Sequence, residues 1–248
     1  GSARLKGITL RIGVIESVPF TIVANVIDTS GRNTTKLTGY VLDLIEYLRD
    51  KMGFVADVQL APPNTSYTGL VLALANGDYD IAIGDITVTS ARREIVAFSN
   101  SISDNSMRIL MRKGTLIDGM DDLKNGKIPY NRIGIRIGTA GEDYYLREIS
   151  GGSRNFYPLK SRQEMYDSLL AGIIDVSFMD IGTAEYVTNN IYCNLTLVGE
   201  DFDKSTFGIV TPKEWLYAKD LDVNILSLRE TGILDNLKKK WFQTKACP

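Results

Sequence analysis

The chain has 248 residues, enough for one large domain or two smaller ones with cores of their own. Apolar residues make up 44% of it and the formal net charge is −2, so no excess of basic charge points to a nucleic acid or an anionic membrane as partner. Histidine does not occur, which excludes Ser–His–Asp and Cys–His catalysis and zinc sites built on imidazole.

The first part of the chain alternates predicted strands and helices. The predicted elements are a strand at 8–15, a polar, turn-rich segment at 17–38, a helix at 40–52 with Gly53 as its stop, a strand at 54–60 and a short apolar helix at 67–75. Strands and helices that alternate at this spacing are typical of an α/β fold with a largely parallel sheet.

The segment 80–99 is the most informative stretch. We expect a short buried strand at 80–84, then a helix with Thr89 or Ser90 as its N-cap. Helix starts favour acidic residues, yet this one carries Arg92 and Arg93. Free backbone N–H groups and a guanidinium at one helix start can trap a carboxylate. The alternative is two surface arginines that are paired with Glu94 or solvated.

The second half repeats the alternation. The predicted elements are a strand at 132–137, a helix at 142–149, a short helix at 165–171, a strand that ends at Asp180, and one or two helices over 222–242 with a break near Thr231-Gly232. Residues 77–85 and 172–180 both read Gly-x-x-Asp-apolar-x-apolar-x-Asp after an amphipathic helix. This repeat predicts two similar α/β lobes, each with a polar group at the carboxyl end of a strand.

Gly138-Thr139-Ala140-Gly141 connects a predicted strand to a predicted helix, where backbone N–H groups can hold an anion. The alternative is a tight turn in which Glu142 and Asp143 merely complement the helix dipole. Asp180 can receive an ammonium group or cap the helix that follows it. The same two possibilities, a ligand contact or a structural role, exist for Glu16 at the end of the first strand. Taken together, two anion sites and one acidic strand end suit an α-amino acid, preferably an acidic one.

Two cysteines, Cys193 and Cys247, are too far apart for a CxxC motif, so they are either free thiols or one disulfide that closes the C-terminus onto the body. Glycosylation tripeptides begin at Asn33, Asn64 and Asn194. Both features favour an oxidising, extracellular setting.

Several motifs resemble one known family. They are 14–17 (Val-Ile-Glu-Ser), 39–44 (Gly-Tyr-Val-Leu-Asp-Leu), 80–83 (Asp-Ile-Ala-Ile), 87–94 (Thr-Val-Thr-Ser-Ala-Arg-Arg-Glu), 98–99 (Phe-Ser), 207–213 (Phe-Gly-Ile-Val-Thr-Pro-Lys) and 232–235 (Gly-Ile-Leu-Asp). With these, nearly the whole chain resembles the ligand-binding domain of ionotropic glutamate receptors, in particular that of an invertebrate rotifer, and more remotely the periplasmic amino-acid-binding proteins of bacteria.

The resemblance implies a two-lobe clamshell of the periplasmic-binding-protein-like type II. Lobe 1 would comprise 3–106 and 208–248, and lobe 2 would comprise 107–207. Gly114-Thr115 resembles the engineered linker that replaces the membrane-spanning pore in soluble versions of such domains. The resemblance also implies a disulfide between Cys193 and Cys247.

The implied ligand is L-glutamate or another α-amino acid, bound in the cleft between the lobes, and cleft closure would open the channel. In lobe 1, the resemblance places Arg92 and Thr87 on the α-carboxylate and the Asp85 backbone carbonyl on the α-amino group. Glu16 and Phe207 would line the cleft. Tyr67 is a candidate for the aromatic lid that family members take from a longer loop.

In lobe 2, Asp180 would accept the α-amino hydrogens, and the backbone N–H groups of Thr139, Ala140 and Gly141 would face the ligand's side chain. The family usually has hydroxyl residues where this chain has Ala140 and Gly141, so we expect a tolerant pocket that also takes small neutral amino acids. With such a ligand, a chloride ion is expected at this helix start. The cations expected near it are Arg136, Lys160 and Arg162.

The same resemblance implies no resident cofactor or metal and no catalysis. It implies an extracellular domain of a plasma-membrane receptor of the postsynaptic type, with membrane contact only in the intact protein. The full receptor would be a homo-tetramer of domain dimers that binds no nucleic acid. The alternatives are a periplasmic amino-acid-binding protein of a transporter and, ranked lowest, an enzyme such as a dehydratase with Asp180 or Glu16 as acid or base.

Overall fold

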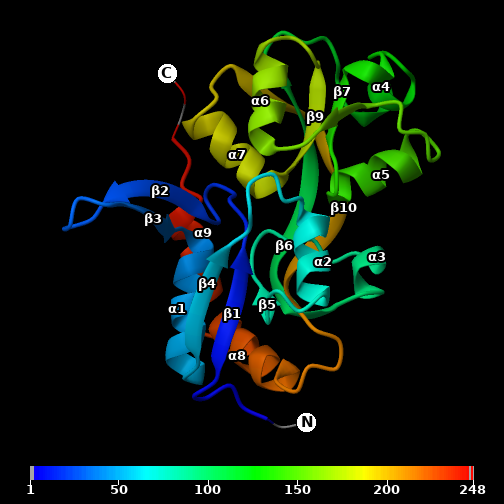
Figure 1. The fold of residues 1–248 in the computed structure, drawn as a ribbon. Coiled ribbons are helices and arrows are strands. Elements are labelled where there is room, and N and C mark those ends of the chain that lie inside the picture. The colour runs from blue at the N-terminus through cyan, green and yellow to red at the C-terminus, as the bar shows by residue number, and fades with distance from the viewer. Residues whose placement is uncertain (1–2, 246, 248) are drawn as a thin grey trace. The chain divides into compact units, whose positions relative to one another are not determined.

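A computed structural model describes residues 3–245 and 247 (Figure 1). Contacts divide the chain into unit 1, which comprises Gly1–Ser103 and Thr206–Phe242, and unit 2, which comprises Asp104–Ser205 and Gln243–Pro248. The predicted lobe 1 includes the C-terminal residues from Gln243 on, whereas these group with unit 2. The physical reason is the disulfide between Cys193 and Cys247, which ties the C-terminal segment to unit 2.

Unit 1 is built on a short sheet in the order β4–β1–β5–β10. The strands are β1 (Thr9–Val14), β4 (Val55–Leu60), β5 (Ile81–Ala82) and the last part of β10 (Leu195–Thr211). β4 and β5 run parallel to β1, and β10 pairs antiparallel with β5. The predicted parallel arrangement is therefore confirmed, with one antiparallel strand added.

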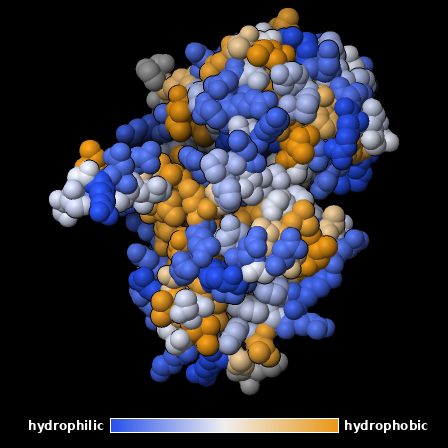
Figure 2. Space-filling model, viewed as in Figure 1, coloured by the Kyte–Doolittle hydropathy of each residue, from blue (hydrophilic) through white to orange (hydrophobic). Residues whose placement is uncertain are grey.

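Helices cover both faces of the unit 1 sheet. They are α1 (Tyr40–Met52), α8 (Ala218–Glu230) and α9 (Ile233–Trp241) on one face, and α2 (Tyr67–Ala75) with the short α3 (Ser90–Arg93) on the other (Figure 1). One core lies between the sheet and α1, α8 and α9, and a second core lies under α2. A hairpin of β2 (Ile22–Ile27) and β3 (Asn33–Thr38) forms a separate two-stranded sheet. Figure 2 shows its tip as mainly hydrophilic or neutral.

Unit 2 repeats this plan. Its strands are β6 (Ala97–Arg112), β7 (Ile133–Arg136), β8 (Tyr157–Leu159) and β9 (Val176–Asp180), in the order β6–β9–β7–β8. β7 runs parallel to β8 and β9, and β6 is antiparallel to β9. Cores on the two faces involve α4 (Met120–Lys124) and α5 (Ala140–Glu148) on one side, and α6 (Arg162–Leu170) and α7 (Ile181–Asn190) on the other. A 3-10 turn, η1 (Tyr130–Arg132), precedes β7.

Strands β6 and β10 each pass from one unit to the other, at Ser103–Asp104 and Ser205–Thr206. The predicted linker at Gly114-Thr115 follows the end of β6, in a turn where Thr115 N donates to Arg112 O. Within residues 3–245 and 247, no helix combines the length and apolar character that a membrane span requires.

Candidate functional site

The sequence repeat lies at matching places in the two units. In unit 1, Asp80 N donates to the Arg11 carbonyl at 2.9 Å, and in unit 2, Asp175 N donates to the Arg132 carbonyl at 2.8 Å. Each carboxylate also binds the guanidinium of the same arginine, at 3.0 and 2.6 Å. The repeat therefore encodes one arrangement, a helix, a turn and an aspartate anchored to the parallel strand beside it.

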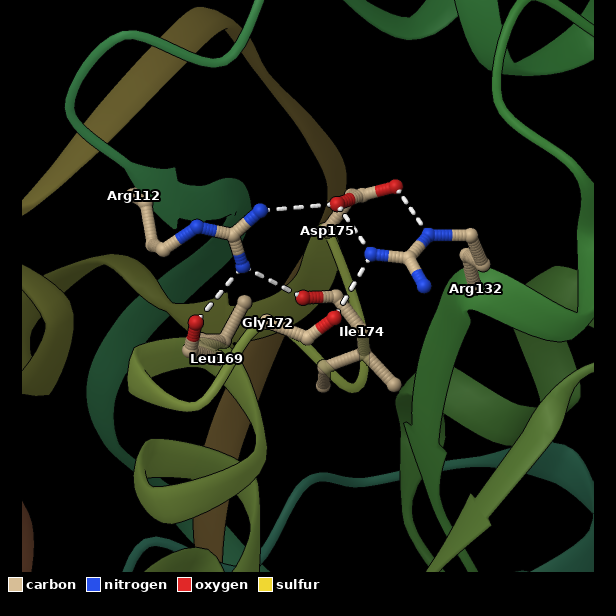
Figure 3. A network of polar contacts seen from close by, with 6 residues as sticks. All are labelled: Arg112, Arg132, Leu169, Gly172, Ile174 and Asp175. Carbon is tan, nitrogen blue, oxygen red and sulfur yellow. Dashed lines mark hydrogen bonds and ion pairs between the residues drawn. The ribbon is translucent and has the colours of Figure 1, made fainter.

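The anchor in unit 2 is the more extensive one (Figure 3). Asp175 accepts from Arg132 through Nε and Nη2 and from Arg112 through Nη2 at 2.8 Å. The two guanidinium groups also donate to main-chain carbonyls at the end of α6 and in the turn after it, namely those of Leu169, Gly172 and Ile174. The Arg132 hydrogen bonds, opposed by burial, lower the pKa of Asp175. This network fixes the turn that leads into β9 and hence the position of Asp180 at its end.

In unit 1 the two arginines at the start of α3 lie in different environments, one buried and one exposed. Thr89 is the N-cap of α3 and its hydroxyl accepts from Arg92 N at 3.1 Å. Arg92 is only 4% exposed, and its Nη1 donates to the Thr87 carbonyl at 2.8 Å. Arg93 is exposed and its guanidinium lies over the Phe98 ring. A buried cation needs polar partners, and of the two arginines only Arg92 is buried.

Asp85 ends the unit 1 repeat as a buried carboxylate. It accepts from the Ser17 hydroxyl at 2.8 Å, and the Tyr67 hydroxyl lies 3.0 Å from both of its oxygens. The sequence predicts a role only for the Asp85 backbone carbonyl, and Ser17 is not among the predicted residues. Tyr67 begins α2 after the N-cap Ser66, so this contact places the predicted aromatic residue beside the edge of β5.

Three further predicted residues lie in unit 1. Thr87 is buried and forms an isolated bridge with Phe207 on β10. Phe207 is itself buried, and its ring packs edge-on against Phe20 at 5.7 Å, so it belongs to the core of unit 1. Glu16 is exposed just beyond β1.

In unit 2 the predicted anion site lies at the start of α5. Thr139 is the N-cap, accepting from Glu142 N, and its hydroxyl donates to the Arg136 carbonyl at 2.7 Å. Gly138 has φ +72°, a conformation that favours glycine, and its N–H donates to the Glu142 carboxylate at 3.3 Å. Arg154 also donates to Glu142, at 2.7 Å. The helix start therefore already has an internal carboxylate, as the alternative of a turn complemented by Glu142 expects.

The other residues predicted around this helix start are all in unit 2. Ala140 and Gly141 form the first residues of α5, and a side chain at Gly141 would meet only ordinary contacts. Arg136 ends β7, Lys160 follows β8, and Arg162 begins α6. Because β7 and β8 are parallel and Arg136 pairs with Leu159, these cations follow the same edge of the sheet.

Asp180 lies at the N-cap of α7, yet its side chain makes no capping hydrogen bond. An aspartate that caps a helix typically stabilises it by about 1 kcal/mol. Its Oδ1 instead accepts from Asn105 Nδ2 at 2.9 Å. The sequence left open whether Asp180 caps a helix or receives an ammonium group. Its side chain does not cap α7, and its carboxylate is hydrogen-bonded to Asn105 of β6 instead. No group of three or more possible metal ligands occurs among residues 3–245 and 247.

Comparisons with known proteins identify the family of the chain. Residues 10–244 match the family model of the bacterial extracellular solute-binding proteins, family 3. Solved structures of the AvGluR1 ligand binding domain, in complexes with glutamate and with phenylalanine, are 96% and 99% identical, with TM-scores of 0.96 and 0.98 and full coverage of both chains. The chain belongs to this solute-binding family, as a ligand-binding domain of the ionotropic glutamate receptor type. The predicted resemblance and fold class are confirmed.

More distant members of the family are similar over part of their length. The L-cystine-binding protein TcyJ of Escherichia coli is 27% identical over 84% of this chain and 75% of its own. Glutamate receptor 3.2 of Arabidopsis thaliana is 26% identical over 62% of this chain, which is 16% of the receptor. The ligand-binding domain thus corresponds to a small part of such a receptor. The disulfide between Cys193 and Cys247, implied by the resemblance, is also confirmed, with the two Cα atoms 5.8 Å apart.

Proposed function

We propose that the chain binds α-amino acids, L-glutamate among them, as the ligand-binding domain of a glutamate-gated ion channel. The observation that carries the proposal is the buried Arg92 at the start of α3, beside Thr87. A guanidinium binds a carboxylate through two parallel hydrogen bonds, and free N–H groups at a helix start add to them. Support for the ligand class comes from AvGluR1 domain complexes with methionine, serine, phenylalanine, glutamate and alanine.

Unit 2 would supply the remaining contacts. We assign the α-ammonium group to the Asp180 carboxylate and the ligand's side chain to the N–H groups of Thr139, Ala140 and Gly141. These donors are main-chain groups, which suits a pocket that accepts side chains of different kinds. We also propose that a chloride ion takes this place when the side chain is neutral, since Arg136, Lys160 and Arg162 follow the same sheet edge.

One ligand that binds both the unit 1 residues and the unit 2 residues would stabilise a closed state. For a shift of about 100-fold in an open–closed equilibrium, that state must gain about 2.7 kcal/mol of differential affinity. Charge-assisted hydrogen bonds at about 1.5–3 kcal/mol each are sufficient. In the full receptor, a homo-tetramer of domain dimers in a postsynaptic-type membrane, closure of this extracellular domain would open the channel. We propose binding without turnover, so mass spectrometry should recover the amino acid unchanged.

The test is calorimetric titration with L-glutamate and with L-alanine, each in chloride and in a methanesulfonate buffer. We expect glutamate to bind in both buffers and alanine to bind more tightly in chloride. Arg92→Ala should abolish binding of both ligands, whereas Arg93→Ala, the exposed neighbour, should leave both unchanged. Equal binding by wild type and Arg92→Ala would refute the carboxylate assignment, and failure of wild type to bind either ligand would refute the function.

A further inference from the structure

The orientation of the Asp180 carboxylate depends on a residue of another strand. Asp180 pairs with Met107 in the antiparallel register of β9 and β6. Asn105 lies two residues before Met107, and residues two apart share one face of a strand. Its amide therefore projects on the same side as Asp180, and the 2.9 Å contact between Nδ2 and Oδ1 follows from that register. Asn105 is 7% exposed, so water competes little for this hydrogen bond.

Asn105 also reaches a second strand. Its Nδ2 lies 3.4 Å from the Ser205 hydroxyl oxygen on β10. Asn105 is the second residue of unit 2 along β6, and Ser205 is the last residue of unit 2 along β10. The amide thus connects the carboxylate to both places where these strands leave unit 2.

The chemistry of the donor matters as much as its place. A carboxylate only accepts hydrogen bonds, so the amide nitrogen must face it. This donor is neutral, so it orients Oδ1 and leaves the negative charge of Asp180 uncompensated by that contact. A lysine or arginine at position 105 would form an ion pair with Asp180 and compete with an incoming ammonium group.

We propose that Asn105 is a positioning residue for amine recognition: it holds Oδ1 of Asp180 so that the carboxylate presents its charge to the α-ammonium group of the ligand. This inference rests on the proposed function and deepens it. A short aspartate side chain reaches the amine only in a narrow range of orientations, so a fixed hydrogen bond to one oxygen improves binding without touching the ligand.

The experiment is a double-mutant cycle with Asn105→Leu and Asp180→Asn, read by calorimetric titration of L-alanine in chloride. A hydrogen bond to a charged group is strong enough that Asn105→Leu should weaken binding about tenfold. On the Asp180→Asn background the same change should add less than a twofold loss, because its effect passes through the carboxylate. The matched control is Asn189→Leu, which removes an amide hydrogen bond to the Glu185 carbonyl elsewhere in unit 2 and should leave affinity unchanged.

A second variant tests the pH dependence of binding, which would not change if Asn105 had only a structural role. Asn105→Asp places a second carboxylate beside Asp180, which raises the pKa of the pair. Binding of L-alanine by this variant should weaken as the pH falls from 7 to 5, whereas wild type should bind alike at both.

Two results would overturn the inference: equal losses from Asn105→Leu on both backgrounds, or a pH profile of Asn105→Asp that matches wild type. The proposed function fails separately, if wild type itself binds no amino acid. The assignment of the amine to Asp180 fails if Asp180→Asn binds L-alanine as wild type does.

Discussion

Arg132 and Asp175 are joined twice, once by side chains and once by main chain. Arg132 Nε and Nη2 donate to the two carboxylate oxygens at 2.6 and 2.8 Å, and Asp175 N donates back to the Arg132 carbonyl. Arg11 and Asp80 form the corresponding pair in unit 1. The first aspartate of each repeat is thus an anchor for the turn before the strand, and the second aspartate is left for the candidate site.

Asp175→Asn should lower the free energy of unfolding by about 2 kcal/mol, since it weakens charge-assisted hydrogen bonds at a side chain that is only 16% exposed. The pKa of Asp175 is lowered from 3.8, so its contribution is fully present above that pH and is lost as the pH falls through the lower folded value. Urea unfolding at pH 7 and pH 3 should show a smaller difference between variant and wild type at the lower pH. Asp201→Asn, at an exposed position, is the control, and an Asp175→Asn variant as stable as wild type at pH 7 would contradict the prediction.

Alkaline pH should destabilise the protein through buried tyrosines. Tyr40 is 2% exposed, and burial raises its pKa to about 12. A raised pKa means that the stabilising contribution is complete below the unfolded value of 10 and is lost as the pH rises from 10 to 12. Thermal unfolding should therefore show a falling midpoint over that range.

Tyr40→Phe should make this fall less steep without abolishing it, because Tyr144 and Tyr145 also have raised pKa values. The exposed Tyr47→Phe should keep the wild-type slope. Identical alkaline profiles for Tyr40→Phe and Tyr47→Phe would show that Tyr40 is not responsible.

Tyr67→Phe should destabilise unit 1 by about 1.5 kcal/mol, because the buried Asp85 carboxylate loses a hydroxyl donor. Ser17→Ala should cost a similar amount. Chemical denaturation measures both, and the exposed Tyr47→Phe again serves as control. If Tyr67→Phe unfolded at the same urea concentration as wild type, the hydroxyl contact would have no energetic role.

In a methanesulfonate buffer, where no chloride takes the same place beside L-alanine, Glu142→Gln should raise the affinity for L-glutamate relative to L-alanine about fivefold. The Glu142 carboxylate accepts from Gly138 N at the start of α5, where it repels a second anion. Two like charges about 4 Å apart repel each other by about 1 kcal/mol even in water, so removing one of them gains about that much. Glu148→Gln, at the other end of the same helix, is the control. An unchanged ratio of the two affinities would show that Glu142 does not influence the ligand's side chain.

The predicted elements match the structure where the hydrophobic pattern is strong. The helix Tyr40–Met52 is found with its predicted bounds, and Gly53 ends it with φ +76°. The hairpin β2–β3 was not predicted, since most of its residues are exposed and carry no alternation. α6 begins at Arg162 rather than 165, because its N-cap Ser161 precedes polar residues that give no apolar period.

In the candidate site, too, local sequence patterns predicted some features, whereas contacts between distant segments were not predicted. The pattern of a helix start identified Arg92 and Arg93 together, the family resemblance selected Arg92, and packing shows that Arg92 is the buried one. Asp180 was correctly placed at the start of a helix, whereas its hydrogen bond with Asn105 involves a residue remote in sequence. Ser17 was missed for a related reason, since its partner Asp85 comes from another segment of the fold. Glu142 was expected only to complement the dipole of its own helix, and its contact with Arg154 was not foreseen.

The disulfide has a mechanical consequence. After α9 the chain leaves unit 1, and Cys247 is bonded to Cys193 of unit 2. A pulling force on the chain at Cys247 therefore has two covalent routes, one through unit 2 at Cys193 and one back along the peptide to α9. Reduction of the disulfide removes the connection to Cys193, so the force is then transmitted only along the peptide chain to α9 of unit 1. The redox state of this one bond therefore determines whether the force acts on unit 2 directly.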